Sequence, residues 1–359
     1  MTEIIDVNIE QAPTKYSIYI DSNPISELHD KIFADNCFSN FLVVISKKVY
    51  KIYQKELNIN KDNLFILNDG ESEKNIENYQ KILKRCEEIN LDRKSAIIAI
   101  GGGVVGDIAG FVAASYMRGI AFIQVPTTLL ACVDSSVGGK VAINTKYGKN
   151  IVGAFYQPKA VYINLNFLNT LDNRQYKSGI AEIIKYAFIE KSCKAMFDYG
   201  LFDFLSVHSS TILDRNLKFL EKIIRICIEL KITVIQKDEK ESGLRKILNF
   251  GHTYGHTLEN ITKYKKFTHG EAVIFGIFFI INYACKAKII DANYKELSFE
   301  LLNKFGFENC KHKFSPQDLL QIMRKDKKSE NANIKVIVPT FKGHVKECDL
   351  NIQTALPLL

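Results

Sequence analysis

The first 168 residues alternate short apolar runs with longer, more polar segments whose apolar residues recur at helical spacing. The apolar runs predict β-strands at residues 16–20, 41–46, 63–67, 95–100 and 120–125. Strands that alternate with helices are typical of a mostly parallel sheet covered by helices on both faces. We therefore predict an α/β domain over residues 1–168.

The pattern changes after residue 168, where helical spacing dominates. Helices are predicted at residues 178–190, 216–236, 252–260, 270–288 and 293–304, and a single strand at 334–339. A chain of 359 residues is long enough for two domains of ordinary size. The second half, residues 169–359, is thus expected to be an all-helical domain.

Composition argues against a membrane or secreted protein. The longest apolar stretch, residues 272–285, is shorter than the roughly 20 residues of a membrane span. Eight scattered cysteines with no CxxC pair favour reduced thiols and a cytoplasmic location. The net charge of +8 could reflect a lysine-rich surface or a site for an anion, and the basic residues form no stripe typical of nucleic-acid binding.

A glycine-rich turn, GGGVVGD at residues 101–107, follows the fourth predicted strand. It contains the spacing GxGxxG, in which glycines allow close approach of a pyrophosphate and the next helix presents its N-terminus to the anion. The usual dinucleotide site has an acidic residue about 20 positions later, but residues 125–128 read VPTT. A carboxylate of the Asp69–Glu71 segment could accept the ribose hydroxyls instead. Both segments could equally be ordinary turns.

Three of the seven histidines, His252, His256 and His269, lie within eighteen residues. His252 and His256 are four apart and would share one face of a helix. Imidazole suits Zn²⁺ and similar metals, and two or three protein ligands with open positions are typical of a catalytic site. Glu182, in an apolar stretch with Lys185, could supply the missing hard ligand. The histidines could instead belong to the core, and the Glu182–Lys185 pair could be a surface salt bridge.

A polar segment, VDSSVGGK at residues 133–140, places a lysine beside two glycines and is followed by Asn144 and by GKN at 148–150. Hydroxyls, backbone N–H groups and lysine ammonium groups could hold phosphate or carboxylate there, although a solvated loop would look the same. Arg118 and Arg245 add planar cations that suit oxyanions.

Six stretches in register resemble the 3-dehydroquinate synthase family of sugar-phosphate cyclases. They read GGGVVGDIAGFVAASYMRGI, VPTTLLACVDSSVGGKVAIN, GKNIVGAFYQP, SGIAEIIKYAFIE, LNFGHTYGHTLE and HGEAV. The resemblance implies a Rossmann-like NAD-binding α/β domain, an all-helical metal- and substrate-binding domain, and an active site in the cleft between them. The chain departs from the family pattern at Gln175, where glutamate is frequent, and in the segment after Lys328.

The resemblance also implies roles for individual residues. Zn²⁺, for which Co²⁺ could substitute, would be held by Glu182, His252 and His269, and His256 would act on the substrate. The substrate pocket would be lined by Asp134, Lys140, Asn150, Lys185, Lys231, Arg245 and Asn249. NAD would be bound by Asp69, Glu71, Lys74, Gly103, Val104, Asp107, Thr127, Thr128, Lys140, Lys149, Phe167, Thr170 and Leu171. Arg118 would contact phosphate across a homodimer interface, and Lys327 or Lys328 would approach it as well.

The implied reaction converts 3-deoxy-D-arabino-heptulosonate 7-phosphate to 3-dehydroquinate and phosphate in the shikimate pathway. It uses transient oxidation by NAD, phosphate elimination, re-reduction and aldol closure. Another sugar-phosphate cyclase and a metal-dependent polyol dehydrogenase are the alternatives. Lys231, Arg245 and Asn249 together favour a substrate that carries a carboxylate.

Overall fold

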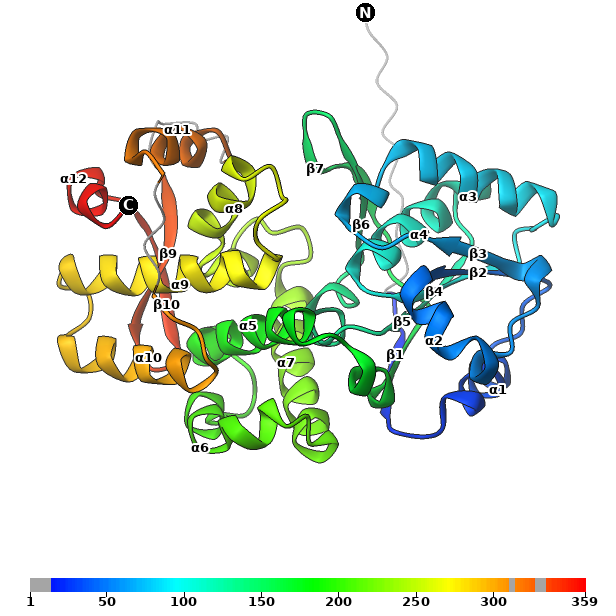
Figure 1. Cartoon of the computed structure of the whole chain (residues 1–359), viewed down its shortest axis with the longest axis horizontal. Coiled ribbons are helices and arrows are strands. Elements are labelled where there is room, and N and C mark those ends of the chain that lie inside the picture. Colours follow the sequence, from blue (N-terminus) through cyan, green and yellow to red (C-terminus); the bar gives the residue numbers. More distant parts are fainter. Residues whose placement is uncertain (1–13, 310–313, 327–333) are drawn as a thin grey trace, which may run out of the picture.

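The computed structural model describes residues 14–309, 314–326 and 334–359, which form two halves that lie side by side (Figure 1). The half that contains the N-terminal part of the chain is built on a sheet, and the other half is mostly helical. This arrangement confirms the predicted fold class.

The main sheet is entirely parallel, with the strand order β1-β8-β5-β4-β2-β3. Its strands are β1 (Ser17–Asp21), β2 (Phe41–Ser46), β3 (Leu64–Leu67), β4 (Ala96–Gly101), β5 (Ala121–Pro126) and β8 (Ala160–Asn164). All of these except β8 were predicted from the sequence. The central strands are buried along almost their whole length, as expected for a parallel sheet that is covered on both faces.

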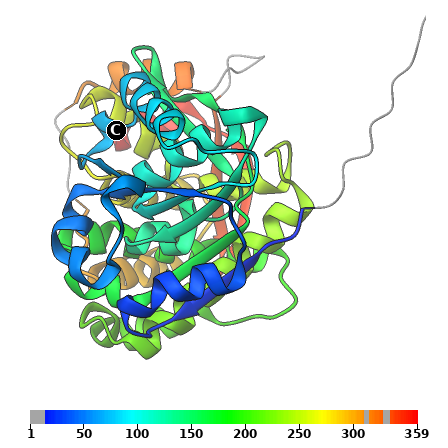
Figure 2. The same ribbon diagram turned by 90° about the vertical axis from the view of Figure 1, so that its right-hand side faces the viewer.

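Four helices cover the sheet: α1 (Leu28–Asp35), α2 (Lys47–Leu57), α3 (Ile76–Glu88) and α4 (Gly103–Ser115). Buried residues of α3 and α4, such as Ile82 and Ile108, form one hydrophobic cluster. Residues of α1 and α2, such as Ile32 and Leu57, form a second cluster on the opposite face. Figure 2 shows this layered half from its outer side. The chain order reverses between β4 and β2, and ligands of such sheets bind at this point of the carboxyl edge.

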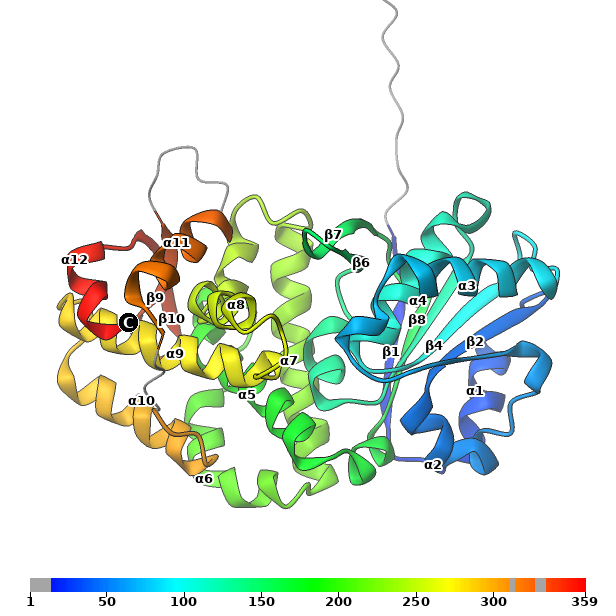
Figure 3. The ribbon, with the colours of Figure 1, turned by 45° about the horizontal axis from the view of Figure 1, so that its top comes forward.

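The segment after residue 139 corrects the sequence interpretation, which treated it as a polar loop. It forms an antiparallel hairpin of β6 (Lys140–Thr145) and β7 (Gly148–Phe155). Val141 and Ile143 of β6 pack into the cluster that contains α4, which fixes the hairpin to the sheet. The hairpin stands between the two halves of the molecule (Figure 3).

The second half contains eight helices in the described residues. They are α5 (Asn173–Ile189), α6 (Leu201–Leu213), α7 (Leu217–Lys237), α8 (His252–Ile261), α9 (His269–Lys286), α10 (Ala292–Lys304), α11 (Pro316–Asp326) and α12 (Ile352–Ala355). Helices α5, α7 and α9 supply nearly half of the buried residues of a large hydrophobic core. The five helices predicted for this half are all present.

One feature of the second half differs from the all-helical prediction. The predicted strand pairs with a strand that was not expected, so that β9 (Lys335–Phe341) and β10 (His344–Asp349) form an antiparallel hairpin. Lys327 and Lys328 lie outside the described residues. Within the described ranges the cysteines are unpaired, and no helix has both the length and the apolar character needed to cross a membrane.

Candidate active site

A buried lysine links the carboxyl ends of β3 and β4. The Nζ atom of Lys74 lies 2.8 Å from Asp107 Oδ2, in the first turns of α4, and 3.3 Å from Glu71 Oε1, just after β3. Asn144 of β6 donates to the same Glu71 oxygen at 2.7 Å. Burial acts against the charge of Lys74, but Asp107 and Glu71 raise its pKa, so the ammonium group is retained. Three residues predicted to bind NAD are thus fixed in one network.

The glycine-rich turn leaves the start of α4 open. The helix begins at Gly103, and no side chain caps its N-terminus. The first N–H groups of an uncapped helix, which include those of Gly103 and Val104, are available to an anion and face it with the positive end of the dipole. Alongside, the N–H of Thr127 donates to the Gly101 carbonyl at 2.9 Å, and Thr128 Oγ1 accepts from Ala131 at 3.2 Å. The end of β5 therefore lies directly beside the glycine-rich turn.

Four further predicted cofactor residues lie around α2, whereas Lys140 and Lys149 belong to the β6–β7 hairpin. Thr170 Oγ1 is 2.7 Å from the hydroxyl oxygen of Tyr53, and the ring of Phe167 packs edge-on against the Tyr53 ring at 5.0 Å. Leu171 follows directly at the end of a short 3-10 turn. Asp69 accepts a hydrogen bond from the first turn of α2, at Lys48 N, over 3.1 Å.

Glu182, His252 and His269 meet in the helical half. Glu182 Oε1 lies 3.6 Å from His252 Nε2 and 3.5 Å from His269 Nε2. The three side chains come from α5, α8 and α9, and their potential ligand atoms lie within 4.8 Å of one another. The sequence pattern predicted Glu182 and all three histidines as candidate ligands, and the family resemblance implied this set of three.

The donor set fits a divalent metal ion. In a tetrahedral zinc site with bonds of about 2.0–2.1 Å, two ligand atoms are separated by roughly 3.4 Å, close to the distances found here. Both carboxylate oxygens of Glu182 are buried and accept no hydrogen bond from the described residues, although one pairs with Lys185. His252 Nδ1 contacts the Phe250 carbonyl oxygen at 3.0 Å. A carbonyl only accepts, so Nδ1 carries the proton and the Nε2 lone pair faces Glu182.

The electrostatics of the cluster agree with this assignment. Burial lowers the pKa of His252 to about 3, which keeps its imidazole neutral. Burial alone would raise the pKa of Glu182, but Lys185, His269 and His252 together outweigh it and the pKa falls to about 2. Burial opposes charge on His269 as well, yet contacts with Glu182 and Glu259 raise its pKa to about 10. The surroundings of His269 Nε2 therefore stabilise a positive charge, as a bound metal ion would carry.

Local sequence explains why α9 begins at His269. Thr268 and Glu271 form a reciprocal capping box at the start of α9. Arg174 of α5 holds the Glu271 carboxylate through two hydrogen bonds of 2.8 and 2.7 Å. Gly270 lies against the α5 backbone, where an added Cβ would come within 2.3 Å of the Ser178 carbonyl oxygen. The motif HGE thus fixes the approach of α9 to α5.

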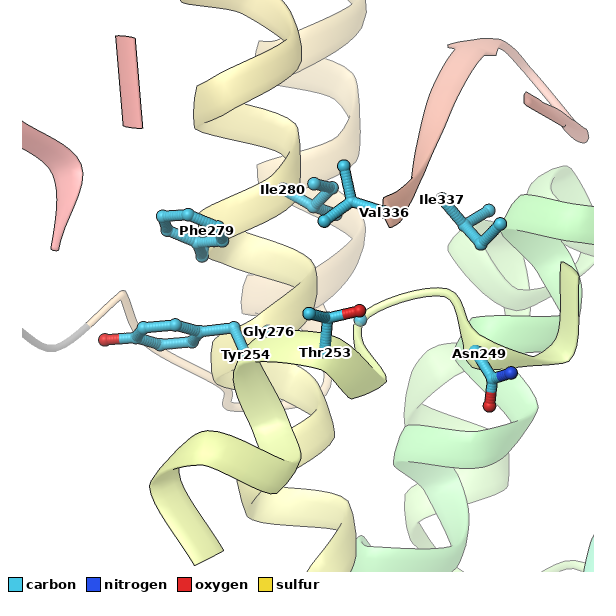
Figure 4. Close-up of a pocket in the computed structure, with 9 residues that line it drawn as sticks. Asn249, Thr253, Tyr254, Gly276, Phe279, Ile280, Val336 and Ile337 are labelled. Carbon is cyan, nitrogen blue, oxygen red and sulfur yellow. The ribbon is translucent and has the colours of Figure 1, made fainter. Parts of the chain in front are cut away.

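A second close approach fixes His252. Gly251, at a φ of +78°, precedes α8, and a Cβ added at Gly276 of α9 would lie 1.7 Å from its carbonyl oxygen. Figure 4 shows Gly276 on α9 with the side chains of Tyr254 and Phe279 nearby. These two rings are stacked, with 4.6 Å between their centroids. The cavity drawn there holds about 10 Å³, room for a single water, so α8 and α9 are closely packed.

A group of buried cations lies next to the metal-binding cluster. Lys231 Nζ is 2.9 Å and Lys185 Nζ is 3.9 Å from Asp134 Oδ1, and Tyr186 donates to the same oxygen at 2.8 Å. Although burial raises it, the charges of Lys231 and Lys185 hold the pKa of Asp134 well below its usual range. Asp134 belongs to a π-helical turn, Ala131–Ser135, a conformation that is frequent at functional sites.

A residue not predicted from the sequence, Glu241, joins this group. Its carboxylate accepts from Asn249 Nδ2 at 2.6 Å and pairs with Lys140 of β6. Arg245 is buried nearby, where its guanidinium donates to the Glu239 and Gly138 carbonyl groups. Residues from both halves of the molecule therefore meet around one set of cations.

Three residues predicted to act on the substrate lie outside the group of buried cations. The His256 ring is 5.4 Å from the His252 ring and 6.1 Å from the His269 ring, beside the metal-binding cluster. Asn150 accepts from Lys74 at 2.6 Å and thus lies on the cofactor side. Arg118 is exposed in a left-handed turn after α4.

Comparison with known proteins places this geometry in a class. The fold matches 2-epi-5-epi-valiolone synthase of Streptomyces hygroscopicus subsp. jinggangensis, solved with NAD⁺ and Zn²⁺, with a TM-score of 0.86, 21% identity and 98% coverage of both chains. It also matches 2-deoxy-scyllo-inosose synthase, solved with carbaglucose-6-phosphate, NAD⁺ and Co²⁺, with a TM-score of 0.78, 24% identity and 95% coverage of both. The fold is that of the sugar-phosphate cyclases.

Sequence comparison defines the family within that class. The family model for the N-terminal part of 3-dehydroquinate synthase matches residues 64–178, and that for its C-terminal part matches residues 179–329. The 3-dehydroquinate synthase of Dictyoglomus thermophilum is 41% identical over 341 residues, which cover 95% of this chain and 93% of the relative. The chain belongs to the 3-dehydroquinate synthase family.

Proposed function

We propose that this protein is an NAD- and divalent-metal-dependent 3-dehydroquinate synthase. It would convert 3-deoxy-D-arabino-heptulosonate 7-phosphate to 3-dehydroquinate with elimination of phosphate, as a carbon–oxygen lyase of the shikimate pathway. The observation that carries this proposal is the buried pair Lys185 and Lys231 directly beside the Glu182–His252–His269 cluster. A metal site next to several cations suits a small substrate with hydroxyl groups and two anionic ends.

The chain's own residues would hold two cofactors. Glu182, His252 and His269 would bind Zn²⁺ or Co²⁺, and the carboxyl edge of the sheet would bind NAD, with the pyrophosphate at the start of α4. When bound, NAD would accept a hydride from the substrate and return it within the same turnover, and the metal ion would supply Lewis acidity toward the substrate hydroxyls. The cofactor residues would be those of the predicted set: Asp69, Glu71, Lys74, Gly103, Val104, Asp107, Thr127, Thr128, Lys140, Lys149, Phe167, Thr170 and Leu171.

The protein groups around the substrate would bind and orient it. Arg245 and Asn249 present N–H donors suited to the carboxylate, and Lys140 would exchange its contact with Glu241 for the substrate. Glu182 and Asp134 raise the pKa of Lys185 against its burial, whereas burial lowers the pKa of Lys231 although Asp134 opposes it. Both amino groups would stabilise negative charge that develops during elimination. His256, beside the metal ligands, would exchange protons with the substrate. Asn150, which accepts from Lys74 on the cofactor side, would complete the pocket where substrate and cofactor meet.

Two further expectations belong to this proposal. Arg118, which is exposed, would reach phosphate in the partner of a homodimer. The cysteines are scattered, and those that the structure describes are unpaired, which supports a cytoplasmic location. We infer that a phosphorylated sugar acid, and neither nucleic acid nor a membrane, is the partner of this protein.

Substrate preference tests the proposal against another sugar-phosphate cyclase. The values of kcat/KM for the heptulosonate phosphate and for a seven-carbon sugar phosphate without a carboxylate would be compared. Because Arg245 is buried, loss of its partner should lower kcat/KM by about 100-fold or more, and the Arg245→Met variant should lose this preference. Lys246→Met, at the half-buried neighbouring position that faces Glu347, is the matched control. Equal use of both substrates by the unmodified protein would contradict the assignment.

A further inference from the structure

We propose that Glu259 is a positioning residue that orients the metal ligand His269 and, through Lys149, ties this ligand to the nucleotide-binding half of the molecule. The inference rests on the proposed function, because it assumes that Glu182, His252 and His269 bind a metal ion. It assigns to Lys149 and Glu259 a structural connection between the two cofactor sites.

Glu259 contacts the ring nitrogen of His269 that points away from the other ligands. Its Oε2 atom lies 3.4 Å from His269 Nδ1, while Nε2 of the same ring faces Glu182. A carboxylate that accepts from Nδ1 fixes the tautomer in which the Nε2 lone pair is directed to the metal, and it makes this nitrogen a stronger ligand. Glu259 is 4% exposed, so water cannot easily take its place.

Lys149 holds the other carboxylate oxygen of Glu259. Its Nζ atom is 3.2 Å from Glu259 Oε1 and 3.8 Å from Glu71 Oε1, and it lies 4.2 Å from the centroid of the Tyr264 ring. Lys149 is on β7 of the hairpin in the nucleotide-binding half, whereas Glu259 and Tyr264 belong to the helical half. One lysine thus bridges a carboxylate of the predicted cofactor site and the carboxylate behind a metal ligand.

A second metal ion at His256, Glu259 and His269 is the competing explanation, since their potential ligand atoms also lie within 4.8 Å of one another. The ammonium group of Lys149 already neutralises the Glu259 carboxylate and would repel an added cation. His269 would also have to bind two ions through its two nitrogens. The geometry therefore favours an orienting role for Glu259 and one ion per chain.

The connection predicts that the two cofactors affect each other's affinity. A cofactor that fixes Glu71 and the hairpin also fixes Lys149 and, through Glu259, the ring of His269. NAD should therefore tighten metal binding, and by linkage the metal should tighten NAD binding by the same factor. Removal of either Lys149 or Glu259 should reduce this factor toward one.

The test measures Zn²⁺ affinity and stoichiometry of the full chain by competition with a chelator, with and without saturating NAD. Glu259→Gln should weaken Zn²⁺ binding by about 10- to 100-fold and shift the visible spectrum of the Co²⁺-loaded protein. Lys149→Met should leave the affinity without NAD within a few-fold and abolish the effect of NAD. Glu190→Gln, a buried carboxylate that caps α6 through Tyr199 N and Leu201 N, is the matched control and should change neither value.

The possible results separate the two proposals. An unmodified protein that binds no divalent ion would overturn both. One tightly bound ion with unchanged affinity, spectrum and NAD effect in Glu259→Gln would overturn the inference alone. Two ions per chain, one of them lost in His256→Ala, would support the competing explanation and contradict the inference. If Glu259→Gln does not fold, Glu259→Asp and Lys149→Met replace it. Zn²⁺ affinity close to that of the unmodified protein in Glu259→Asp, together with loss of the NAD effect in Lys149→Met, would support the inference, and an unchanged NAD effect in Lys149→Met would contradict it.

Discussion

A single methyl group at Gly276 should disrupt the metal site without touching any ligand. In Gly276→Ala the new Cβ would lie 1.7 Å from the Gly251 carbonyl oxygen, and contacts below 3.0 Å are essentially never found. Helices α8 and α9 must therefore separate locally by roughly 1.3 Å, whereas metal ligands have to be held within about 0.5 Å. Gly251 directly precedes His252, so the displacement is transmitted to a ligand.

The effects on stability and on metal binding can be measured separately. Overpacking in a close-packed core costs about 1–3 kcal/mol, and the gain from alanine in a helix offsets roughly 0.5–1 kcal/mol of it. We expect a net loss of about 1–2 kcal/mol in urea unfolding, and a loss of Zn²⁺ affinity of at least tenfold by calorimetric titration. Gly243→Ala is the control, because the nearest atom to its Cβ would be 3.9 Å away. A folded Gly276→Ala variant with unchanged Zn²⁺ affinity would refute the reasoning.

Three further predictions concern the two cofactor sites. Glu182→Gln should abolish tight Zn²⁺ binding and, because it leaves the buried Lys185 without its nearest carboxylate, should lower the free energy of unfolding by about 3–5 kcal/mol; wild-type metal affinity would contradict this. Lys74→Met should weaken NAD binding by about tenfold or more, since it removes the cation that fixes Asp107 and Glu71, and Zn²⁺ affinity measured without NAD should stay unchanged. Chelation of the metal should lower the melting temperature, because Zn²⁺ at 100 times its Kd stabilises the fold by about 2.7 kcal/mol; identical melting curves with and without chelator would exclude a bound ion.

Glu182 and the histidine group could be predicted as candidate metal ligands from local sequence, whereas the choice of His269 over His256 came from the family resemblance. The four-residue spacing of His252 and His256 and the charge of Glu182 within an apolar helix are visible without any tertiary information. The same is true of the glycine-rich turn after β4. Their assembly at the junction of the two halves followed from the family resemblance.

Other features depend on contacts between distant residues. Glu241 lies in the charged run KDEKES, which resembles an exposed loop, and only the fold brings it to Lys140, 101 residues earlier. The β6–β7 hairpin was missed because its glycines and lysines hide the alternation of its apolar residues. Likewise β8 is short, and its place between β1 and β5 is set by pairing across the sheet.

The most direct test of the proposed function uses NAD in amounts far below those of the heptulosonate phosphate, with Zn²⁺ present. Phosphate release and the absorbance of NADH would be followed in the same sample, beside a His252→Ala variant. We predict phosphate in large excess over NAD, no accumulation of NADH, and no activity in the variant. Accumulation of NADH without phosphate would indicate a polyol dehydrogenase and contradict the assignment.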